Sequence, residues 1–573
     1  MYSKLENILN ESFKKLGYNI STKVIKSKAG DVDYQCDDLF KLAKEYHKAP
    51  FMIGDEVIEE IKGRDDFELY FKSIEVVKPG FININVSDKL INLSLKELMD
   101  SEKLGSTVED KTIIVDYGGP NVAKPLHVGH LRTAIIGQAI YNILKFKGNK
   151  VIGDVHLGDI GTQMGQVIYG ILNDFPNTKF EDINFDLDYL NRTYPKMSAL
   201  FKTDDDVKEK CLKITKDLQD EFRALYFNES LEDNHNYKVL WQKIWDISVG
   251  DIKRLYDFLS VHFDLWYGES HAYRQFPEMI PFIESKGVVR EDDGAKLIDV
   301  EEDDDKVKMP PFMIQKSDGA YLYSTHDLGT IWQRKKDFNP DEILYVVDAR
   351  QSMYFTQLFR AVRKTNMYDG LLAHYGNGTV NGSDNKPFKT RDGGTLKLES
   401  LIEQVRDQFV SLREENKNMD KEDLDKIVNA IIKFADLQND LTRNYIFDIK
   451  KFSEVNGKTG SYILYTYLRI NKLLSSNNGS LSDNVYNKAD RDLRLKLIDV
   501  SSVIDQASRE RKPHYIANYL YELSVLANNF YEANKMSDLE DSVKNDYDIV
   551  LSFNNNVLKT LLELLGIHIP KKM

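Results

Sequence analysis

Cysteine is scarce in this chain. Only Cys36 and Cys211 occur among 573 residues, and they lie far apart in the sequence. Two such residues cannot build a disulfide framework, and neither has a neighbour at the spacing of metal ligands. We therefore expect no structural disulfide and no metal site. The composition is typical of a protein of the reducing cytoplasm.

Long apolar runs are also missing. No segment approaches the roughly 18 uninterrupted apolar residues that a membrane span needs. Near the N-terminus, Leu5, Leu9 and Phe13 repeat at helical spacing, but Glu6 and Glu11 interrupt the apolar core of any signal peptide. The pattern predicts an amphipathic helix, and we expect no membrane partner.

Positive charge is in deficit. The chain has 77 Lys and Arg against 91 Asp and Glu, a formal net charge of −14. Nonspecific coating of nucleic acid depends on neutralising many phosphates, so this charge argues against it. A local basic face is still compatible with the total. With 42% apolar and 29% charged residues, the chain has the composition of a globular protein, and its length suggests three or four domains.

The pattern of apolar and polar residues changes at about residue 109 and again after residue 442. The first region has a helical opening, a predicted strand at 68–77, a turn at Pro79-Gly80 and the alternating strand 81–86. It predicts a small α+β module. From about residue 109, short β-branched runs alternate with helical patterns, which predicts a parallel α/β core.

Two further segments depart from that alternation. Residues 172–300 are charged and mostly helical in period, so we expect a helical insertion within the α/β domain. After residue 442 strand signals nearly vanish and apolar residues recur at helical offsets. This part predicts an all-α bundle.

The most informative segment follows the predicted strand at 112–115. There a loop leads to His127-Val128-Gly129-His130, which opens a helix. The start of a helix presents free amides that suit phosphate, and two imidazoles three residues apart can both donate to it. Gly129 leaves room for a flat ring, and Lys124 adds a charge. A lone histidine here would more often be an ordinary helix-terminal group, but the combination indicates nucleotide chemistry.

This segment resembles the first signature of class I aminoacyl-tRNA synthetases, and the chain is similar to arginyl-tRNA synthetases over nearly its whole length. The motifs that carry the resemblance are Pro120-Asn121-Val122-Ala123-Lys124, the loop 158–165, the segment 317–323, His326-Asp327 and Asp348-Ala349-Arg350-Gln351. One departure is Ile160, where the family usually has Trp. The resemblance implies ATP-dependent activation of L-arginine, with Mg²⁺ bound to the ATP, and transfer to tRNA(Arg).

The resemblance also implies a domain plan. It predicts an α/β fold class, with a Rossmann-like parallel-sheet catalytic domain at 109–441, a small α+β N-terminal domain at 1–108 that contacts tRNA, and an all-α anticodon-binding bundle at 442–573. The segment 461–469 is similar to that bundle, although Leu464 stands where Gln is frequent. We expect a monomer that activates arginine only with tRNA bound.

The second class I signature, a Lys-Met-Ser-Lys loop, is absent. Pro387-Phe388-Lys389-Thr390-Arg391 takes its place, as in many arginyl enzymes, where the lysine before the first signature compensates. By resemblance, Lys124, His127, His130 and Lys389 are the catalytic residues, and together with Gly129 they bind ATP. A surface cation is an equally good interpretation of Lys389.

Arginine requires a carboxylate for its guanidinium and polar groups for its α-amino end. By resemblance, Tyr323 and Asp327 line the guanidinium pocket, and a spacing of four places them on one face if they are helical. Asp327 could instead cap a helix, and Tyr323 could belong to the core. The remaining expected substrate-binding residues are Asp116, Gly119, Pro120, Asn121, His130 and Gln351.

Three rival interpretations stay open. The paired-histidine turn also occurs in other class I synthetases and in small nucleotidyltransferases. A catalytically silent RNA-binding relative is the third. Such a relative should have lost His127, His130 or Lys124, and all three are present. Because a site shaped for a guanidinium rejects analogues strongly, we expect no editing domain and interpret 172–300 as structural or tRNA-facing.

Overall fold

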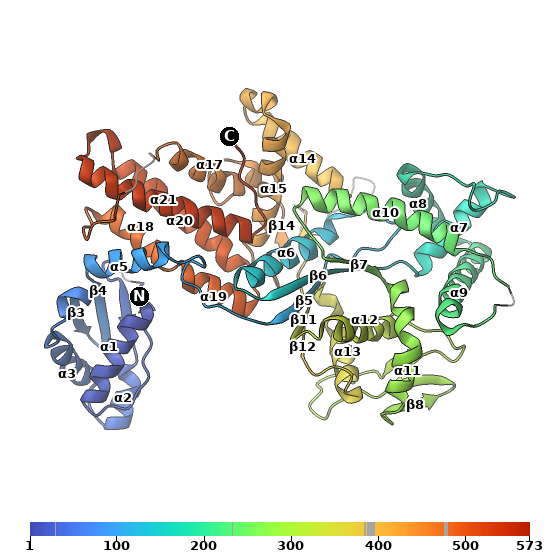
Figure 1. The fold of residues 1–573 in the computed structure, drawn as a ribbon, viewed down its shortest axis with the longest axis horizontal. Helices are drawn as coiled ribbons and strands as arrows, with labels where there is room; N and C mark the ends of the chain where they lie inside the picture. The colour runs from blue at the N-terminus through green and yellow to red at the C-terminus, as the bar shows by residue number, and fades with distance from the viewer. Residues whose placement is uncertain (29, 232, 383–385, 387–395, 475–478) are drawn as a thin grey trace. The chain divides into compact units, whose positions relative to one another are not determined.

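The computed structural model describes residues 1–573 except 29, 232, 383–385, 387–395 and 475–478 (Figure 1). Contacts divide the chain into two compact units. Unit 1 comprises residues 1–107, 466–505 and 519–560. Unit 2 comprises residues 108–465, 506–518 and 561–573. The C-terminal region therefore contributes to both units.

The N-terminal part of unit 1 is the expected α+β module. Its four strands form an antiparallel sheet in the order β1-β2-β4-β3. The elements are α1 (Tyr2–Lys15), β1 (Ile25–Lys26), β2 (Tyr34–Cys36), α2 (Leu39–Tyr46), α3 (Pro50–Lys62), α4 (Phe67–Tyr70), β3 (Phe71–Val77), β4 (Phe81–Val86) and α5 (Asp88–Met99).

The predicted strand at 68–77 begins too early. Residues Phe67–Tyr70 form the helical turn α4, and β3 starts only at Phe71. The ring of Phe67 stacks on that of Phe71, with centroids 5.5 Å apart. Side chains four residues apart meet on a helical turn, whereas a strand would carry them about 13 Å apart. This aromatic contact accounts for the helical start.

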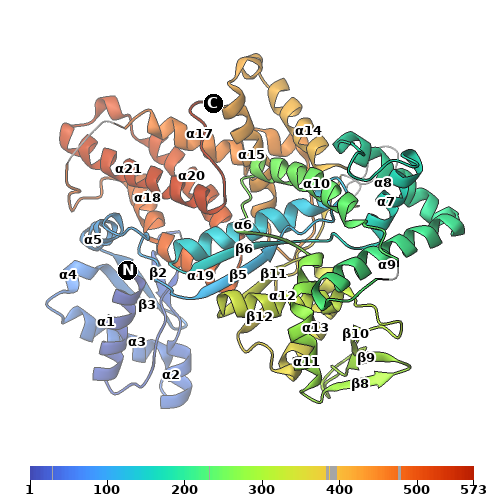
Figure 2. The same cartoon turned by 45° about the vertical axis from the view of Figure 1, so that its right-hand side comes forward.

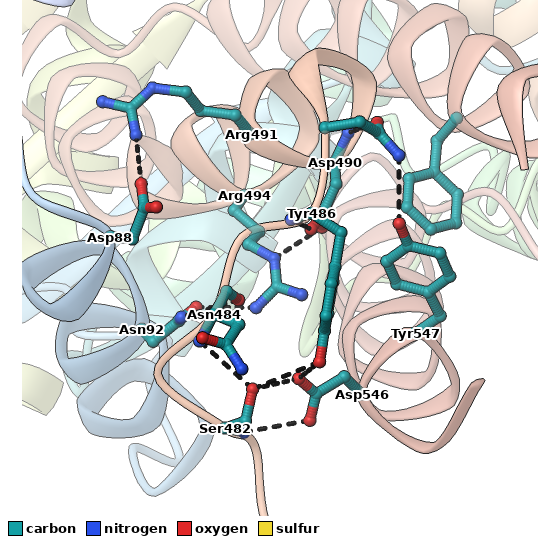
Figure 3. Close-up of polar contacts among 12 residues, drawn as sticks. Asp88, Asn92, Ser482, Asn484, Tyr486, Asp490, Arg491, Arg494, Asp546 and Tyr547 are labelled. Atoms are coloured by element: carbon teal, nitrogen blue, oxygen red, sulfur yellow. Dashed lines mark hydrogen bonds and ion pairs between the residues drawn. The ribbon is translucent and has the colours of Figure 1, made fainter. Parts of the chain in front are cut away.

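The C-terminal helices of the chain confirm the expected loss of strands. They are α17 (Gly460–Asn471), α18 (Lys488–Ile498), α19 (Val500–Glu510), α20 (His514–Ala533), η5 (Met536–Asp538) and α21 (Asp541–Leu564). Within unit 1, a buried polar cluster joins α18 to α5 (Figure 3). Arg494 of α18 meets Asp490 at 2.5 Å and donates to Asn92 of α5 at 2.6 Å. All three side chains are buried.

A second arginine reinforces the same junction. Arg491 donates to Asp88 at 2.7 Å and to Asp33 at 2.5 Å. On the other side of Arg494 in Figure 3, Tyr486 donates to Asp546 of α21 at 2.8 Å. Charge-assisted hydrogen bonds of this kind are about twice as strong as neutral ones. Unit 1 is thus held together in part by polar contacts between segments distant in sequence.

Unit 2 is built on a five-stranded parallel sheet in the order β12-β11-β5-β6-β7. The strands are β5 (Thr112–Tyr117), β6 (Lys150–Leu157), β7 (Leu265–Gly268), β11 (Glu342–Val346) and β12 (Leu371–His374). Figure 2 shows α6 (Leu131–Phe146) on one side of this sheet and α12 (Tyr323–Phe338) and α13 (Ser352–Thr365) on the other. The predicted Rossmann-like α/β fold class is confirmed.

The strand order contains a switch point. From β5 the chain continues through β6 and β7 on one side, then returns to place β11 on the other side of β5. Loops leaving β5 and β11 therefore diverge at the carboxyl ends of these strands. In open α/β sheets, ligands bind in the crevice that this divergence leaves.

The expected helical insertion at 172–300 is wholly helical only in its first part, because strands accompany the helices of its second part. Its helices are α7 (Thr162–Asp174), α8 (Leu187–Thr203), α9 (Asp205–Phe227) and α10 (Lys238–Phe258). Then β7 pairs with β6 in the main sheet, and β8 (Val289–Asp292), β9 (Ala295–Ile298) and β10 (Phe312–Gln315) form an antiparallel sheet. The strand β7 is only four residues long, so its pattern did not distinguish it from the helices around it.

The remaining elements of unit 2 lie outside the two larger sheets. They are η1 (Val128–His130), η2 (Glu269–Gln275), α11 (Phe276–Glu284), η3 (Ala349–Gln351), β13 (Val380–Asn381), α14 (Leu398–Ser411), η4 (Glu414–Asn418), α15 (Lys421–Leu437), β14 (Tyr445–Ile446) and α16 (Ile449–Ser453). The two-residue strand β14 pairs with β13 and is an exception to the predicted all-α region after 442. None of the described helices combines the length and apolarity of a membrane span.

Candidate active site

A cavity of about 820 Å³ lies at the carboxyl ends of β5 and β11. Every residue that lines it belongs to unit 2. Most of the expected site residues meet there. Those that line the cavity are Asp116, Gly119, Asn121, His127, Gly129, His130, Tyr323, Asp327 and Gln351. The switch point of the sheet therefore gathers expected residues from three separate sequence segments, 116–130, 323–327 and 351.

The histidine turn is the short helix η1, with His127 as its N-cap, followed directly by α6. The rings of His127 and His130 stack with centroids 3.8 Å apart. The amide of Gly129 donates to Nδ1 of His127 at 3.0 Å, and the amide of His127 donates to Nδ1 of His130 at 3.2 Å. Each Nδ1 is an acceptor, so the proton of a neutral ring sits on Nε2.

Free amides at the start of the helix, as expected from the sequence, are not what the structure shows. The Val128 amide donates to the carbonyl of Leu396 at 3.0 Å, and the His130 amide donates to the carbonyl of His127 at 2.9 Å. Together with the Gly129 bond, these contacts occupy the amides of η1. The ligand donors that this turn offers are therefore the two Nε2–H groups.

Both imidazoles are held neutral. Burial, then the charge of Lys124, lowers the pKa of His127. Burial, then the neighbouring His127 and Lys124, lowers the pKa of His130 to about 3. At neutral pH the turn thus presents two uncharged donors.

Tyr323 and Asp327 lie on the same face of α12, one turn apart. Tyr323 is its first residue and its side chain is 60% exposed, so the core alternative for Tyr323 is wrong. The N-cap is Leu322, so Asp327 does not cap this helix. Burial raises the pKa of Asp327 to about 7, although the hydroxyl of Tyr354 donates to its carboxylate.

Asp116 lines the cavity but is already paired. The buried guanidinium of Arg334, on α12, donates to Asp116 and also to Asp154, at 2.6 Å and 3.0 Å for the latter. It further donates to the hydroxyl of Tyr345 at 3.2 Å. Two carboxylates share one guanidinium, so the floor of the cavity keeps an excess of negative charge. Asp116 can act on a ligand mainly through this shared field.

Glu269 also lines the cavity and was not expected. Burial, and after it the charges of Asp159 and Asp327, raise its pKa to about 8. Glu269 directly follows β7 and opens η2. A polar residue at the carboxyl end of a parallel strand is a typical ligand contact. That signal was present in the sequence, but it required recognising 265–268 as a sheet strand.

Gly119 and Asn121 stand where the loop after β5 meets the end of β6. A Cβ on Gly119 would lie 2.3 Å from the carbonyl oxygen of His156, so only glycine fits this approach. Asn121 forms a β-bridge with Gly158, and Gln163 donates to its side chain at 3.4 Å. The side-chain oxygen of Asn121 thus already accepts one hydrogen bond, and the residue still lines the cavity.

Two expected residues, Pro120 and Lys124, are not among those that line the cavity. The carbonyl of Pro120 accepts the Gly158 amide at 3.1 Å, which is a backbone role. The ammonium of Lys124 lies 5.1 Å from the ring centroid of Tyr194. Lys389 lies outside the described residues. Gln351, by contrast, ends η3 after β11 and lines the cavity.

The cavity combines two kinds of recognition. Neutral Nε2–H donors suit phosphate oxygens, and the acids Asp327 and Glu269, with Tyr323 and Tyr354, suit a forked cation. Arg350 is turned back on Asp348, with hydrogen bonds of 2.9 Å and 2.6 Å. The site can therefore hold a ligand that is cationic at one end beside a second ligand that carries phosphates.

Three family models match consecutive parts of the chain. The model described as arginyl tRNA synthetase N terminal domain matches residues 3–86. The model of tRNA synthetases class I (R), catalytic domain, matches residues 94–449. The DALR anticodon binding domain matches residues 463–573.

Two full-length relatives are similar in sequence. The arginine–tRNA ligase of Alkaliphilus oremlandii is 38% identical over 600 aligned positions, which cover all of both chains. The arginine–tRNA ligase of Agathobacter rectalis is 39% identical over 611 positions, again covering both chains completely.

Two solved structures share the fold. The arginyl-tRNA synthetase of Plasmodium falciparum superposes with a TM-score of 0.80 at 24% identity, covering 100% of this chain and 99% of the other. The arginyl-tRNA synthetase of Thermus thermophilus superposes with a TM-score of 0.77 at 20% identity, covering all of both chains.

Proposed function

This chain belongs to the arginyl-tRNA synthetase family, and on that premise we propose that it activates L-arginine with ATP and transfers it to tRNA(Arg). The observation that carries the proposal is one cavity that holds both a pair of neutral imidazoles and a pair of buried acids. Neither pair alone would identify the reaction.

The first step joins arginine to AMP. A carboxylate oxygen of arginine attacks the α-phosphorus of ATP, the bond to the β-phosphate breaks, and pyrophosphate leaves. ATP brings its Mg²⁺ ion as part of the substrate. In such a displacement, alignment and stabilisation of charge carry most of the acceleration, so no protein nucleophile is needed.

We assign the phosphate contacts to the histidine turn. The Nε2–H groups of His127 and His130 donate to oxygens of the reacting phosphates, because their Nδ1 atoms are already used as acceptors. Lys124 and Lys389 are the proposed cations for the β- and γ-phosphates. Gly129, beside the His127 ring, is the proposed place where the adenosine part passes close to the backbone.

We assign the guanidinium to Asp327 and Glu269, with Tyr323 beside them. In the free protein these acids have raised pKa values because they are buried near each other and near other acids. A guanidinium between them favours their ionised forms, since an opposite charge at short range lowers a carboxyl pKa. Asn121 and Gln351, with Gly119 and His130, are the proposed contacts of the α-amino end.

In the second step a hydroxyl of the terminal ribose of tRNA attacks the acyl carbon, and AMP leaves. We propose that residues 1–108 and 442–573 contact the tRNA and that 109–441 carries the chemistry. We also propose that the protein acts as a monomer. The two buried free thiols support a reducing compartment such as the cytoplasm.

Charging of total tRNA with each labelled amino acid in turn tests the activity. We expect arginine alone to be attached, because a buried acid site of this kind rejects analogues without a guanidinium by roughly 10⁴ to 10⁵. Attachment of any other amino acid would refute the proposal. The family's dependence on tRNA adds a second test: pyrophosphate exchange should be nearly silent until tRNA is added.

A further inference from the structure

The carboxylate of Asp159 is fully buried and takes no part in the proposed chemistry. Its Oδ1 accepts the amide of Ser270 at 2.9 Å, and its Oδ2 accepts the Ser270 hydroxyl at 2.5 Å. No basic side chain pairs with it in the part of the chain that the structure describes. A buried acid without a cation is costly, so its retention calls for an explanation.

The residue that Asp159 binds is the immediate neighbour of Glu269. Ser270 is the second residue of η2, and Glu269 is the first. Two hydrogen bonds to one residue fix both its backbone and its side chain. A Cβ on Gly268 would lie 2.5 Å from Oδ2 of Asp159, so the carboxylate also packs against the residue before Glu269.

Asp159 is itself anchored. Its carbonyl accepts the indole N–H of Trp241 at 3.0 Å, which ties the loop after β6 to α10. The backbone of Asp159 is therefore held by a contact outside η2. The bonds to Ser270 transmit the position of Asp159 to the first turn of η2.

The helix η2 in turn packs closely on α12, which carries Asp327. The ring of Tyr273 meets that of His326 edge-on, with centroids 4.9 Å apart. A Cβ on Gly329 would lie 3.0 Å from Phe276 and 3.2 Å from the carbonyl of Ala272. A shift of η2 would thus change the separation of Glu269 from Asp327.

We propose that Asp159 is a positioning residue for amino-acid recognition. Its two hydrogen bonds to Ser270 hold η2 in the position in which Glu269 and Asp327 both bind the same guanidinium. The inference deepens the proposed function and rests on it. Displacement of a binding group by about 1 Å can cost roughly 100-fold in rate. Such a residue acts through geometry, so its substitution should affect arginine and spare ATP.

The test compares Asp159→Ala with Asp159→Asn in tRNA charging by the full-length protein, with arginine and ATP varied in turn. Alanine removes both acceptors, and we expect the KM for arginine to rise about 10- to 100-fold with the KM for ATP within about twofold. Asparagine can still accept the Ser270 amide and donate to its hydroxyl. We expect Asp159→Asn to restore a KM close to that of the wild type.

Glu221→Ala is the matched control. Glu221 is also buried and accepts two backbone amides, those of Tyr237 and Lys238 at 2.9 Å and 3.0 Å, but it does not line the cavity. Its loss should lower the melting temperature and leave both KM values unchanged. If Asp159→Ala does not fold, Ser270→Ala decides, because it removes only the hydroxyl bond and should raise the KM for arginine a few-fold.

Several outcomes would overturn the inference. They are equal rises in the KM for arginine and ATP, an Asp159→Asn variant as impaired as Asp159→Ala, and an unchanged KM in Ser270→Ala. The second would mean that the charge of Asp159, not its geometry, acts on the substrate. A wild-type protein that charges no arginine would instead defeat the proposed function itself, which keeps the two failures distinct.

Discussion

The two units each bury an arginine, and the two arginines serve different ends. Arg334 in unit 2 is 2% exposed and Arg494 in unit 1 is fully buried. Arg334 is shared by two carboxylates, and one of them, Asp116, lines the cavity. Arg494 pairs with one carboxylate of its own helix, Asp490, and its bond to the amide of Asn92 joins α18 to α5.

The difference lies in the balance of charge. One guanidinium against two acids leaves unit 2 with residual negative charge beneath a ligand site, whereas Arg494 and Asp490 neutralise each other. A buried pair that is neutral and linked to an amide fixes how elements pack. An unbalanced one sets the field that an incoming cation meets. Variants of each centre should therefore separate effects on arginine use from effects on folding.

The largest expected effect on charging comes from Arg334→Met. It leaves Asp116 and Asp154 buried without a cation, so we expect about 3–5 kcal/mol lower stability and at least a roughly 1,000-fold loss of kcat/KM. Denaturant unfolding and charging kinetics measure the two. Arg334→Lys keeps the charge but not the fork and should be intermediate. A folded Arg334→Met protein with normal charging would break the comparison.

Asp327→Asn should come next. Loss of the carboxylate leaves the guanidinium poorly paired, and we expect kcat/KM for arginine to fall about 100- to 1,000-fold with the KM for ATP unchanged. Stability should not fall, because burial already disfavours the ionised form of Asp327. A variant that loses stability and keeps its affinity for arginine would place Asp327 with the structural centre, beside Arg494.

The next largest expected effect is the pH dependence of kcat/KM for arginine. Burial raises the pKa of Asp327 to about 7, and the guanidinium requires the ionised acid. Below that pKa the acid is protonated, so kcat/KM for arginine should fall with pH, and it should level off only above about pH 8, where Glu269 is also ionised. Asp327→Asn should remove the part of this fall that lies near pH 7 and leave the part near pH 8. A wild-type profile that stays level from pH 5 to 8 would contradict the assignment.

Arg494→Met should have the smallest effect on chemistry. It leaves Asp490 uncompensated, so we expect about 3–5 kcal/mol lower stability, yet kcat/KM for arginine within about threefold when assayed well below the melting temperature. The double variant Arg494→Met with Asp490→Leu should recover most of the stability, since no charge is left buried. A large loss of arginine activation in a folded Arg494→Met protein would show that this centre also acts on the cavity.

Local spacing predicted part of the site well. His127 and His130 are three residues apart, and Tyr323 and Asp327 are four apart, so helical geometry alone brings each pair together. The sharing of Asp116 by Arg334 could not be predicted in this way, because 218 residues separate them. Glu269 was missed for the same reason, since its place depends on β7 pairing with β6.

The fold shows the same limit. The local pattern of apolar and polar residues predicted the α+β module, the parallel sheet and the helical C-terminal region, since each follows from local periodicity. The expectation of free amides at η1 was wrong, in part because Leu396, far along the chain, supplies a carbonyl that accepts the amide of Val128. The assignment of C-terminal segments to both units also depends on long-range contacts.

The uncharged state of the histidine turn has a consequence for ionic strength. Added salt screens interactions between full charges over about a Debye length, but it weakens a short, oriented N–H donor contact far less. The contacts of His127 and His130 with nucleotide should therefore tolerate a rise in salt that loosens a polyanionic RNA from cationic side chains. Because ATP meets only the two proposed cations Lys124 and Lys389 beside this turn, the KM for tRNA should rise with salt more steeply than the KM for ATP.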